Sequence, residues 1–253
     1  IGRLVGSEMC IRDRYPVLGA SYQPRAGVAR HDAVAWGYAM RADELGVDII
    51  QNCEVKKIRT AKGKVQGVET SKGFIRSNRV GVVASGHTSV LAATAGIKLP
   101  LQSKALQALV SEPIKPVINT VVMSNAVHAY VSQSDKGELV IGAGTDGYNS
   151  YTQRGGYNII EDTIRAIVEL YPIFGKMKML RQWGGIVDIT PDASPILSKC
   201  EVEGLYFNCG WGTGGFKATP GSANVFAHTI AKNKAHKINA PFSVDRFVSG
   251  RLV

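Results

Sequence analysis

The amino-acid sequence, 253 residues long, predicts a mixed α/β or α+β fold with a second sheet inserted into the first lobe. Three patterns predict it. Residues 53–85 alternate between apolar and polar side chains, residues 157–171 repeat apolar side chains at helical spacing, and a glycine-rich turn follows the apolar run 204–209. Apolar residues make up 45% of the chain, which is enough for a sizeable core.

The first hundred residues predict a helix, a buried strand and a small antiparallel meander. Apolar side chains recur at helical spacing from residue 31, Asp32 is a candidate cap or first-turn acid, and Gly46 ends the helix. The apolar run after this glycine predicts a buried strand, and alternation with glycines at the turns predicts antiparallel strands after it. In order, these elements are the helix 31–45, the strand 47–52 and the meander 53–85, which ends in a buried strand at 80–85.

The rest of the chain predicts an antiparallel sheet and two helices. The helix 157–171 is the clearest, because Ile160, Ile164 and Ile167 share one face. A short strand at 204–209 precedes the glycine-rich turn, and a second helix is expected from about Pro220 to Lys232. The strand-like runs of the sheet are 105–113, 118–124, 128–134 and 138–144.

The charge balance indicates an anionic partner. Lys and Arg number 30 against 20 Asp and Glu, so the formal net charge is +10. The basic residues are scattered and no known nucleic-acid-binding motif occurs, which disfavours nucleic acid. The favoured anions are therefore the phosphates of a cofactor or an acidic face of another subunit.

The cysteines and the beginning of the chain predict a cytoplasmic protein whose first residues are foreign to it. Cys10, Cys53, Cys200 and Cys209 lack metal-ligand spacing and are too few for a disulfide framework, so we expect reduced thiols. No apolar run approaches the ~20 residues that span a bilayer. Residues 1–14 differ in character from the rest of the chain and are interpreted as a non-native leader, and we expect the natural chain to extend upstream.

Two glycine-rich stretches resemble phosphate-binding motifs. Residues 142–147 fit GxGxxG after a strand, but the next residues are poor helix formers, so this match is interpreted as a strand-end turn. Residues 210–217 follow a strand and precede a helix, yet Ala218 replaces the Ser or Thr of a P-loop. A turn with so many glycines still lets backbone N–H groups approach a ligand closely, and we expect a ligand there.

Several stretches resemble one enzyme family. The run GLYFNCGWGTGGFKATPGSA at 204–223 resembles the flavin-contacting segment of the FAD-dependent glycine/D-amino acid oxidase family, and WGGIVDITPDASPIL at 183–197 resembles the strand and turn before it. Residues 15–55, which include the tripeptide Arg-His-Asp, and the ending FSVDRFVSGRLV are similar to the β subunits of heterotetrameric sarcosine oxidases. The resemblance covers nearly all of residues 15–253.

The resemblance implies an FAD/NAD(P)-binding-type lobe with an inserted, mostly antiparallel substrate-domain sheet. The family's N-terminal βαβ unit, which carries GxGxxG, is missing, so this lobe is expected to be incomplete. The predicted domains are the FAD-binding lobe at 15–100, the substrate domain at 101–192, and the return of the FAD-binding lobe with a C-terminal tail at 193–253.

The resemblance also implies a second flavin. His31 matches the histidine that carries covalent FMN, and imidazole is a suitable nucleophile for such a bond. By itself, a histidine that enters a helix indicates a capping or surface residue. Arg30 and Arg25 lie close in sequence and are positioned to neutralise the FMN phosphate, although solvated surface arginines are an equally good interpretation.

The residues expected to contact non-covalent FAD fall in three segments. Lys217 is the predicted catalytic residue, because its ammonium can stabilise negative charge on reduced flavin; the alternative is a lysine that pairs with a carboxylate or reaches solvent. Gly86 is expected to be glycine so that FAD can approach. The full set implied by the resemblance is Val55, Ala84, Ser85, Gly86, Gly212, Thr213, Gly214, Gly215, Phe216 and Lys217.

The implied activity is oxidation of sarcosine to glycine and a formaldehyde equivalent, with O2 reduced to H2O2. The implied partners are the α, γ and δ subunits of a heterotetrameric oxidase, with tetrahydrofolate bound by the α subunit. One alternative is another amine or amino acid dehydrogenase of the family, of the proline or dimethylglycine type, and the other is a non-catalytic docking subunit.

No metal is expected, since the remaining histidines lack ligand spacing: His87, His128, His228 and His236. Aromatic side chains in or near the inserted sheet are core residues by default, and some are candidates for the wall of a small-amine pocket: Tyr130, Tyr148, Tyr151 and Trp183.

Overall fold

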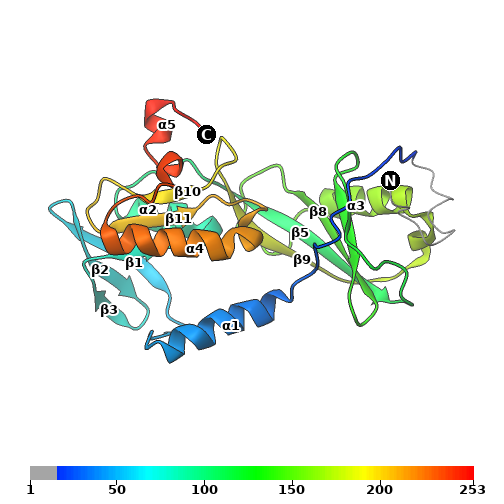
Figure 1. Ribbon diagram of the computed structural model, residues 1–253, viewed down its shortest axis with the longest axis horizontal. Coiled ribbons are helices and arrows are strands. Elements are labelled where there is room, and N and C mark those ends of the chain that lie inside the picture. Colours follow the sequence, from blue (N-terminus) through cyan, green and yellow to red (C-terminus); the bar gives the residue numbers. More distant parts are fainter. Residues whose placement is uncertain (1–15) are drawn as a thin grey trace. The chain divides into compact units, whose positions relative to one another are not determined.

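The computed structural model describes residues 16–253, apart from the side chain of Ala143 (Figure 1). The predicted foreign leader at 1–14 therefore lies outside the described residues. The chain forms two compact units. The first contains the described residues up to Ile49 together with Ala105–Gly147 and Thr152–Gly185, and the second contains Ile50–Lys104, Tyr148–Tyr151 and Ile186–Val253.

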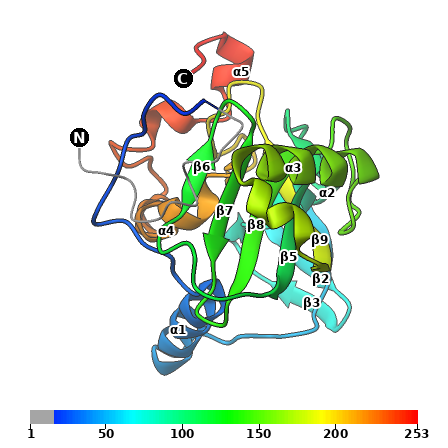
Figure 2. The same ribbon diagram turned by 90° about the vertical axis from the view of Figure 1, so that its right-hand side faces the viewer.

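The first unit is built on an antiparallel sheet covered on one face by a helix. The strand order is β6-β7-β8-β5-β9, and α3 (Tyr157–Leu170) with the 3-10 turn Pro172–Lys176 packs on one face (Figure 2). Apolar side chains from both layers form its core, including Leu109, Ile141, Ile167 and Phe174. The strands are β5 (Gln102–Pro113), β6 (Val122–Ser124), β7 (Ala129–Gln133), β8 (Glu138–Thr145) and β9 (Met179–Ile189).

The second unit holds a short mixed sheet with a helix packed against it. In the strand order β10-β11-β4, β11 (Leu205–Cys209) pairs parallel with β4 (Val80–Val82) and antiparallel with β10 (Ile196–Lys199). The helix α4 (Gly215–Lys232) inserts Val225 and Phe226 against this sheet. The unit also contains the antiparallel meander β1 (Val55–Ala61), β2 (Lys64–Thr70) and β3 (Gly73–Arg76), the helix α2 (Thr88–Thr94), and the helix α5 (Arg246–Ser249) near the C-terminus.

The meander, the four-stranded run of 105–144 and the helix 157–171 were predicted with small boundary errors. Two other predictions were wrong. Residues 47–52 form no strand, and Val47, Ile49 and Ile50 are each about half exposed. The predicted buried strand 80–85 ends at Val82, and Val83 is 65% exposed. A strand needs a hydrogen-bonded neighbour, and among the described residues β4 has one only on its β11 side, while 47–52 has none.

The helices α1 and α4 also differ from their predictions. The helix α1 (His31–Glu44) forms where expected, but it buries no residue, and Trp36, Tyr38 and Met40 are exposed. The helix α4 begins at Gly215, five residues before the predicted start, and contains Pro220. A proline removes the bond to the carbonyl four residues earlier and its ring crowds that carbonyl, but a helix that is held by packing further along can tolerate both costs.

No described helix combines the length and the apolar character that crossing a bilayer requires.

The helix α2 was not predicted, because its run of small and β-branched residues has no clear helical periodicity.

A close contact across the sheet of the first unit leads to a stability prediction. A Cβ atom at Gly142 would lie 1.6 Å from the ring of Tyr130, whose residue faces Gly142 on the neighbouring strand, whereas a Cβ at Gly144 would meet nothing within 4 Å. We expect Gly142→Ala to lower the free energy of unfolding by about 1–3 kcal/mol, because the Tyr130 ring must move out of its place. Gly144→Ala is the matched control on the same strand and should have little effect. Urea unfolding of both variants measures the difference, and equal stabilities would contradict the contact.

Candidate functional site

Two segments that were predicted to contact a ligand leave the same edge of the sheet in the second unit. In the parallel pair, Leu205 of β11 faces Val80 of β4 and Phe207 faces Val82. The residues after these two strands, 84–86 and 210–215, therefore emerge side by side at the carboxyl ends. In open α/β sheets, ligands bind outside this edge. The strand–turn–helix order expected for residues 204–232 is present.

The glycine-rich turn has a backbone that only glycine adopts readily. Gly210 has φ +75° and Gly212 has φ +52°, both in the left-handed region. A Cβ at Gly210 would also lie 2.7 Å from Cγ2 of Thr190. The turn is fixed by Asp188, whose Oδ2 accepts a bond from the Gly210 N–H at 2.6 Å and whose carbonyl accepts one from the Gly212 N–H at 2.9 Å. Both N–H groups are therefore used to hold the turn rather than to bind a ligand.

Trp211 and Cys209 complete the support of the turn. The indole Nε1 of Trp211 donates to Oδ1 of the buried Asn208 at 2.6 Å, and the Trp211 carbonyl accepts from Gly214 N–H at 2.9 Å. Burial, together with the nearby Asp188 charge, raises the pKa of the Cys209 thiol far above its ordinary value. Cys209 is therefore a neutral packing residue and not a nucleophile.

The start of α4 is open to an electron-rich group. Its first N–H groups have no intrahelical acceptor, Gly214 caps the helix without a side chain, and its first turn contains no acidic residue. Phe216 is 52% exposed and Lys217 is also exposed. Among the described residues no carboxylate pairs with Lys217, so of the two alternatives to a catalytic role, exposure to solvent is the one that the structure retains. A positive helix end and a free ammonium favour negative charge at this point.

The other segment, Ala84–Gly86, is held by the end of β9. Ser85 has φ +45°, and its Oγ donates to the carbonyl of Ile186 at 3.3 Å. A Cβ at Gly86 would lie 2.2 Å from Cγ2 of Ile186. Ile186 by itself therefore requires glycine at 86, and the approach of FAD to this residue stays a prediction. Residues 186–188 therefore contact both segments of the edge.

The remaining predicted site residues lie elsewhere in the fold. Arg30 forms an exposed ion pair with Asp135, and His31 is the exposed first residue of α1, both within the first unit. Arg25 is exposed in the irregular segment before that helix. Val55 begins β1, in a separate sheet of the second unit. The structure thus brings together Ala84–Gly86 and Gly212–Lys217, and the cofactor contacts of all the predicted site residues stay predictions.

The GxGxxG match at 142–147 is part of a strand and its end, and three histidines contact other aromatic rings. Residues 142–145 belong to β8, and the next helix along the chain begins only at Tyr157. The helix that a dinucleotide-binding motif needs directly after its glycines is therefore lacking there. His87 packs its ring on Tyr151, and His228 and His236 lie edge to face with ring centroids 5.1 Å apart. Within residues 16–253, no group of three or more His, Cys, Asp or Glu side chains is arranged to hold a metal ion.

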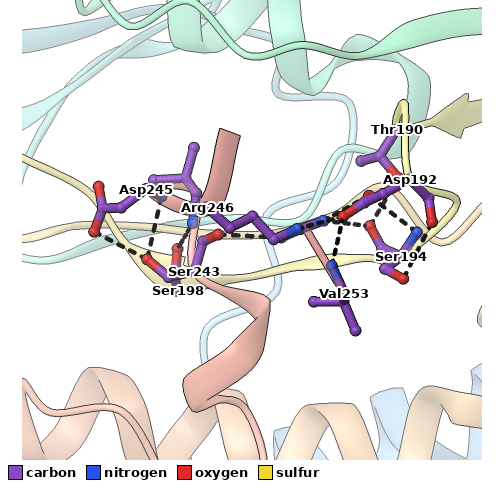
Figure 3. Close-up of polar contacts among 9 residues, drawn as sticks. Thr190, Asp192, Ser194, Ser198, Ser243, Asp245, Arg246 and Val253 are labelled. Atoms are coloured by element: carbon purple, nitrogen blue, oxygen red, sulfur yellow. Dashed lines mark hydrogen bonds and ion pairs between the residues drawn. The ribbon is translucent and has the colours of Figure 1, made fainter. Parts of the chain in front are cut away.

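Sequence reasoning missed the residues behind the site. Asp188 and Asp192 are both acids in or beside the largely apolar strand β9, and a carboxylate in such a run must find buried partners. That pattern was the available signal. The side chain of Asp192 is 4% exposed and forms an ion pair with the side chain of Arg246, which is 3% exposed (Figure 3). The Arg246 guanidinium, with the Ser194 and Val253 N–H groups, holds the pKa of the Asp192 carboxyl well below its ordinary range despite burial.

Comparison with known proteins places this site in an enzyme family. The family described as DAO, FAD dependent oxidoreductase, matches residues 3–229. The chain is 59% identical over 240 residues to a sarcosine oxidase subunit beta of Arthrobacter sp. and 57% identical to that of Rhodobacter capsulatus, covering 95% of this chain each time. It spans 59% and 58% of the lengths of those two relatives. The crystal structure of L-proline dehydrogenase from P. horikoshii matches with a TM-score of 0.79 and 27% identity, over 87% of this chain and 60% of that one.

The buried ion pair predicts an acid-sensitive contribution to stability. Because the pKa of Asp192 is lower in the folded state than the ~3.9 of an unfolded chain, its stabilisation is complete above about pH 4 and declines as the pH falls further. Asp192→Asn should cost about 3–5 kcal/mol at pH 7, since it leaves the Arg246 charge unpaired and buried. The deficit relative to the unmodified chain should shrink by roughly 1 kcal/mol per pH unit below pH 4.

Urea unfolding at pH 7, 5, 4 and 3 measures this deficit. Asp135→Asn is the control, because its ion pair with Arg30 is exposed and should contribute at most about 1 kcal/mol at any pH. A deficit for Asp192→Asn that stays constant from pH 7 to 3 would contradict the assigned shift.

Proposed function

The chain belongs to the FAD dependent oxidoreductase family, and on that premise we propose that it serves as the β subunit of a multi-subunit oxidase that converts sarcosine, water and O2 into glycine, formaldehyde and H2O2. Membership of the family implies FAD. The proposal for substrate and assembly is supported by the identity of 50–59% to three sarcosine oxidase β subunits.

The observation that carries the proposal is the backbone-lined edge formed by Ala84–Gly86 and Gly210–Gly215. The residues there fit a flavin: the turn has no side chains at four positions, the start of α4 is uncapped and without acid, and Lys217 is exposed without an acidic partner among the described residues. FAD supplies two-electron acceptance from a C–H bond next to nitrogen. Phe216, Lys217 and the N–H groups at the start of α4 would hold it, and the glycines would let it approach the backbone closely.

The chain's own contribution is placement and charge. The α4 N-terminus and the Lys217 ammonium stabilise negative charge that develops beside them during amine oxidation, which lowers the barrier to that charge separation. Asp188 keeps the turn in the one conformation that presents these groups, since it binds two of its N–H groups. No acid or base from this chain is required by the proposal.

A second flavin, FMN bound covalently to His31, is also proposed. His31 supports this by its exposure at the first turn of α1, where its ring is accessible. Arg30 would have to leave Asp135 to meet the phosphate. The ion pair between Arg30 and Asp135 is exposed, so breaking it costs little free energy. Arg25 is exposed and is the other proposed phosphate partner.

The proposal extends to a βαβ unit, to partner subunits and to location. The relatives are longer than this chain, and we propose that a further unit of the FAD-binding lobe, with Val55 at its adenine end, covers apolar residues that the second unit leaves exposed, such as Val83. We also propose the α, γ and δ subunits as partners, tetrahydrofolate on the α subunit as acceptor of the formaldehyde, and a cytoplasmic location. The lobes are proposed to divide at residues 100 and 192.

One alternative has its own observation. The 27% identical structural match is an L-proline dehydrogenase, so a different secondary amine is a second candidate substrate for the same site. A docking subunit without its own flavin is the non-catalytic alternative, and it predicts neither flavin absorbance nor amine turnover.

The first test is covalent attachment of flavin. In the complete subunit assembled with its partners, acid precipitation should leave yellow colour in the pellet, and digestion should give a flavinylated peptide that contains His31. His31→Asn should lose the bound colour. His128→Asn is the control, because His128 is exposed and has φ +51°, a conformation that asparagine tolerates well. A pellet from the unmodified enzyme that keeps no yellow colour after acid precipitation would exclude covalent FMN.

The second test is the role of Lys217. We expect Lys217→Met to lower kcat for sarcosine about 10²-fold, because it removes a positive charge from the place where negative charge develops. Lys232→Met removes an exposed lysine from the other end of α4 and should keep activity. Peroxide release with sarcosine, dimethylglycine and proline measures both the effect and the substrate. Unchanged turnover in Lys217→Met would contradict the assigned role, and faster turnover of proline than of sarcosine would support the alternative substrate.

A further inference from the structure

The C-terminal segment holds a buried arginine that uses all three guanidinium nitrogens. Arg246 donates from Nε and Nη2 to the two carboxylate oxygens of Asp192 at 2.7 and 3.0 Å, and Nη2 also reaches the Ser194 carbonyl at 2.7 Å. Nη1 donates to the carbonyl of Ser243 at 3.1 Å (Figure 3). This fork geometry fixes the direction of Asp192 as well as its charge.

The turn that Arg246 binds is otherwise strained. Ala193 has φ +54°, a conformation that costs about 1 kcal/mol or more for a residue with a side chain. The Thr190 Oγ1 and the Arg246 guanidinium both donate to the Ser194 carbonyl, and the Ala193 N–H donates to the Thr190 carbonyl at 3.1 Å. Without Arg246, a buried carboxylate would be unpaired, and the turn from 190 to 194 would lose contacts that hold it.

The segment 188–194 also contacts the glycine-rich turn at two points. Cγ2 of Thr190 occupies the space next to Gly210, and Asp188, two residues earlier in the chain, binds the N–H groups of Gly210 and Gly212. Movement of the segment 188–194 therefore moves the backbone that presents α4 and Lys217.

We propose that Arg246 is a positioning residue for the flavin-binding turn, acting through Asp192 and the segment 188–194. The inference rests on the proposed function, because it assumes that the turn from 210 to 215 holds flavin. It assigns to the C-terminal segment a part in catalysis, although the hydrogen bonds of Arg246 go to none of the residues predicted to contact the cofactor.

A purely stabilising role makes a different prediction from a positioning role. A buried ion pair can often be replaced by apolar side chains of similar volume with no loss of stability. Such a swap removes the two charges together, so the net charge is unchanged, but it also removes the directional fork. The double variant Arg246→Met with Asp192→Leu therefore separates the two roles.

The experiment uses the complete subunit in its assembled, flavin-loaded enzyme. For the double variant we expect a thermal midpoint equal to or above that of the unmodified enzyme, a changed visible spectrum and reduction potential of the non-covalent flavin, and kcat for sarcosine lower by about tenfold with a smaller change in KM. Arg251→Met, five residues further along the same segment and exposed, should leave all of these unchanged.

The outcomes are distinct. Unaltered spectrum, potential and kcat in a stable double variant would overturn the inference. If the double variant fails to fold, Arg246→Lys decides the question, because it keeps the charge and loses the fork; it should shift the flavin spectrum and lower kcat, and behaviour identical to the unmodified enzyme would again overturn the inference. An unmodified assembly that binds no flavin would instead overturn the proposed function, and this inference with it.

Discussion

The parallel pairing of β11 with β4 is the contact on which the candidate site depends. Because the two strands run in the same direction, the segments 84–86 and 210–215 leave the sheet at one edge. Neither segment carries an unusual set of reactive side chains. What they offer together is backbone, an uncapped helix end and one lysine, which suits a cofactor that brings its own chemistry.

A site that consists mainly of backbone needs other residues to stabilise its conformation. Glycines give the turn its close approach, but they also make it flexible, and the free energy of ordering it has to come from other contacts. Asp188 supplies two hydrogen bonds directly, and the buried pair of Asp192 and Arg246 holds the next turn of the chain. This buried ion pair thus lies behind the candidate site, where geometry matters more than net stabilisation.

Several apolar residues stay exposed because no described part of the chain packs on them. Val83 and the run 47–50 have the composition of buried strands, and α1 has the composition of a packed helix, yet each lacks a neighbouring layer among residues 16–253. The helix α1 forms from local propensity although it buries no residue. Residues 47–50 form no strand, because no neighbouring strand among the described residues is available to bond with them. Helices satisfy their backbone groups internally and strands cannot, so the two predictions had different outcomes for one reason.

Sequence alone determined the local elements and the chemistry of the turn. The alternation in 53–76, the helix at 157–170 and the strand–glycine–helix order after residue 204 depend on neighbours a few positions apart, and such patterns can be read directly. The tertiary structure decided which residues stand behind the turn. Asp188 meets Gly210 across 22 positions and Arg246 meets Asp192 across 54, and periodicity carries no information about pairs so far apart. It also decided why residue 86 is glycine: Ile186, a hundred positions away, fills the space that a side chain would need.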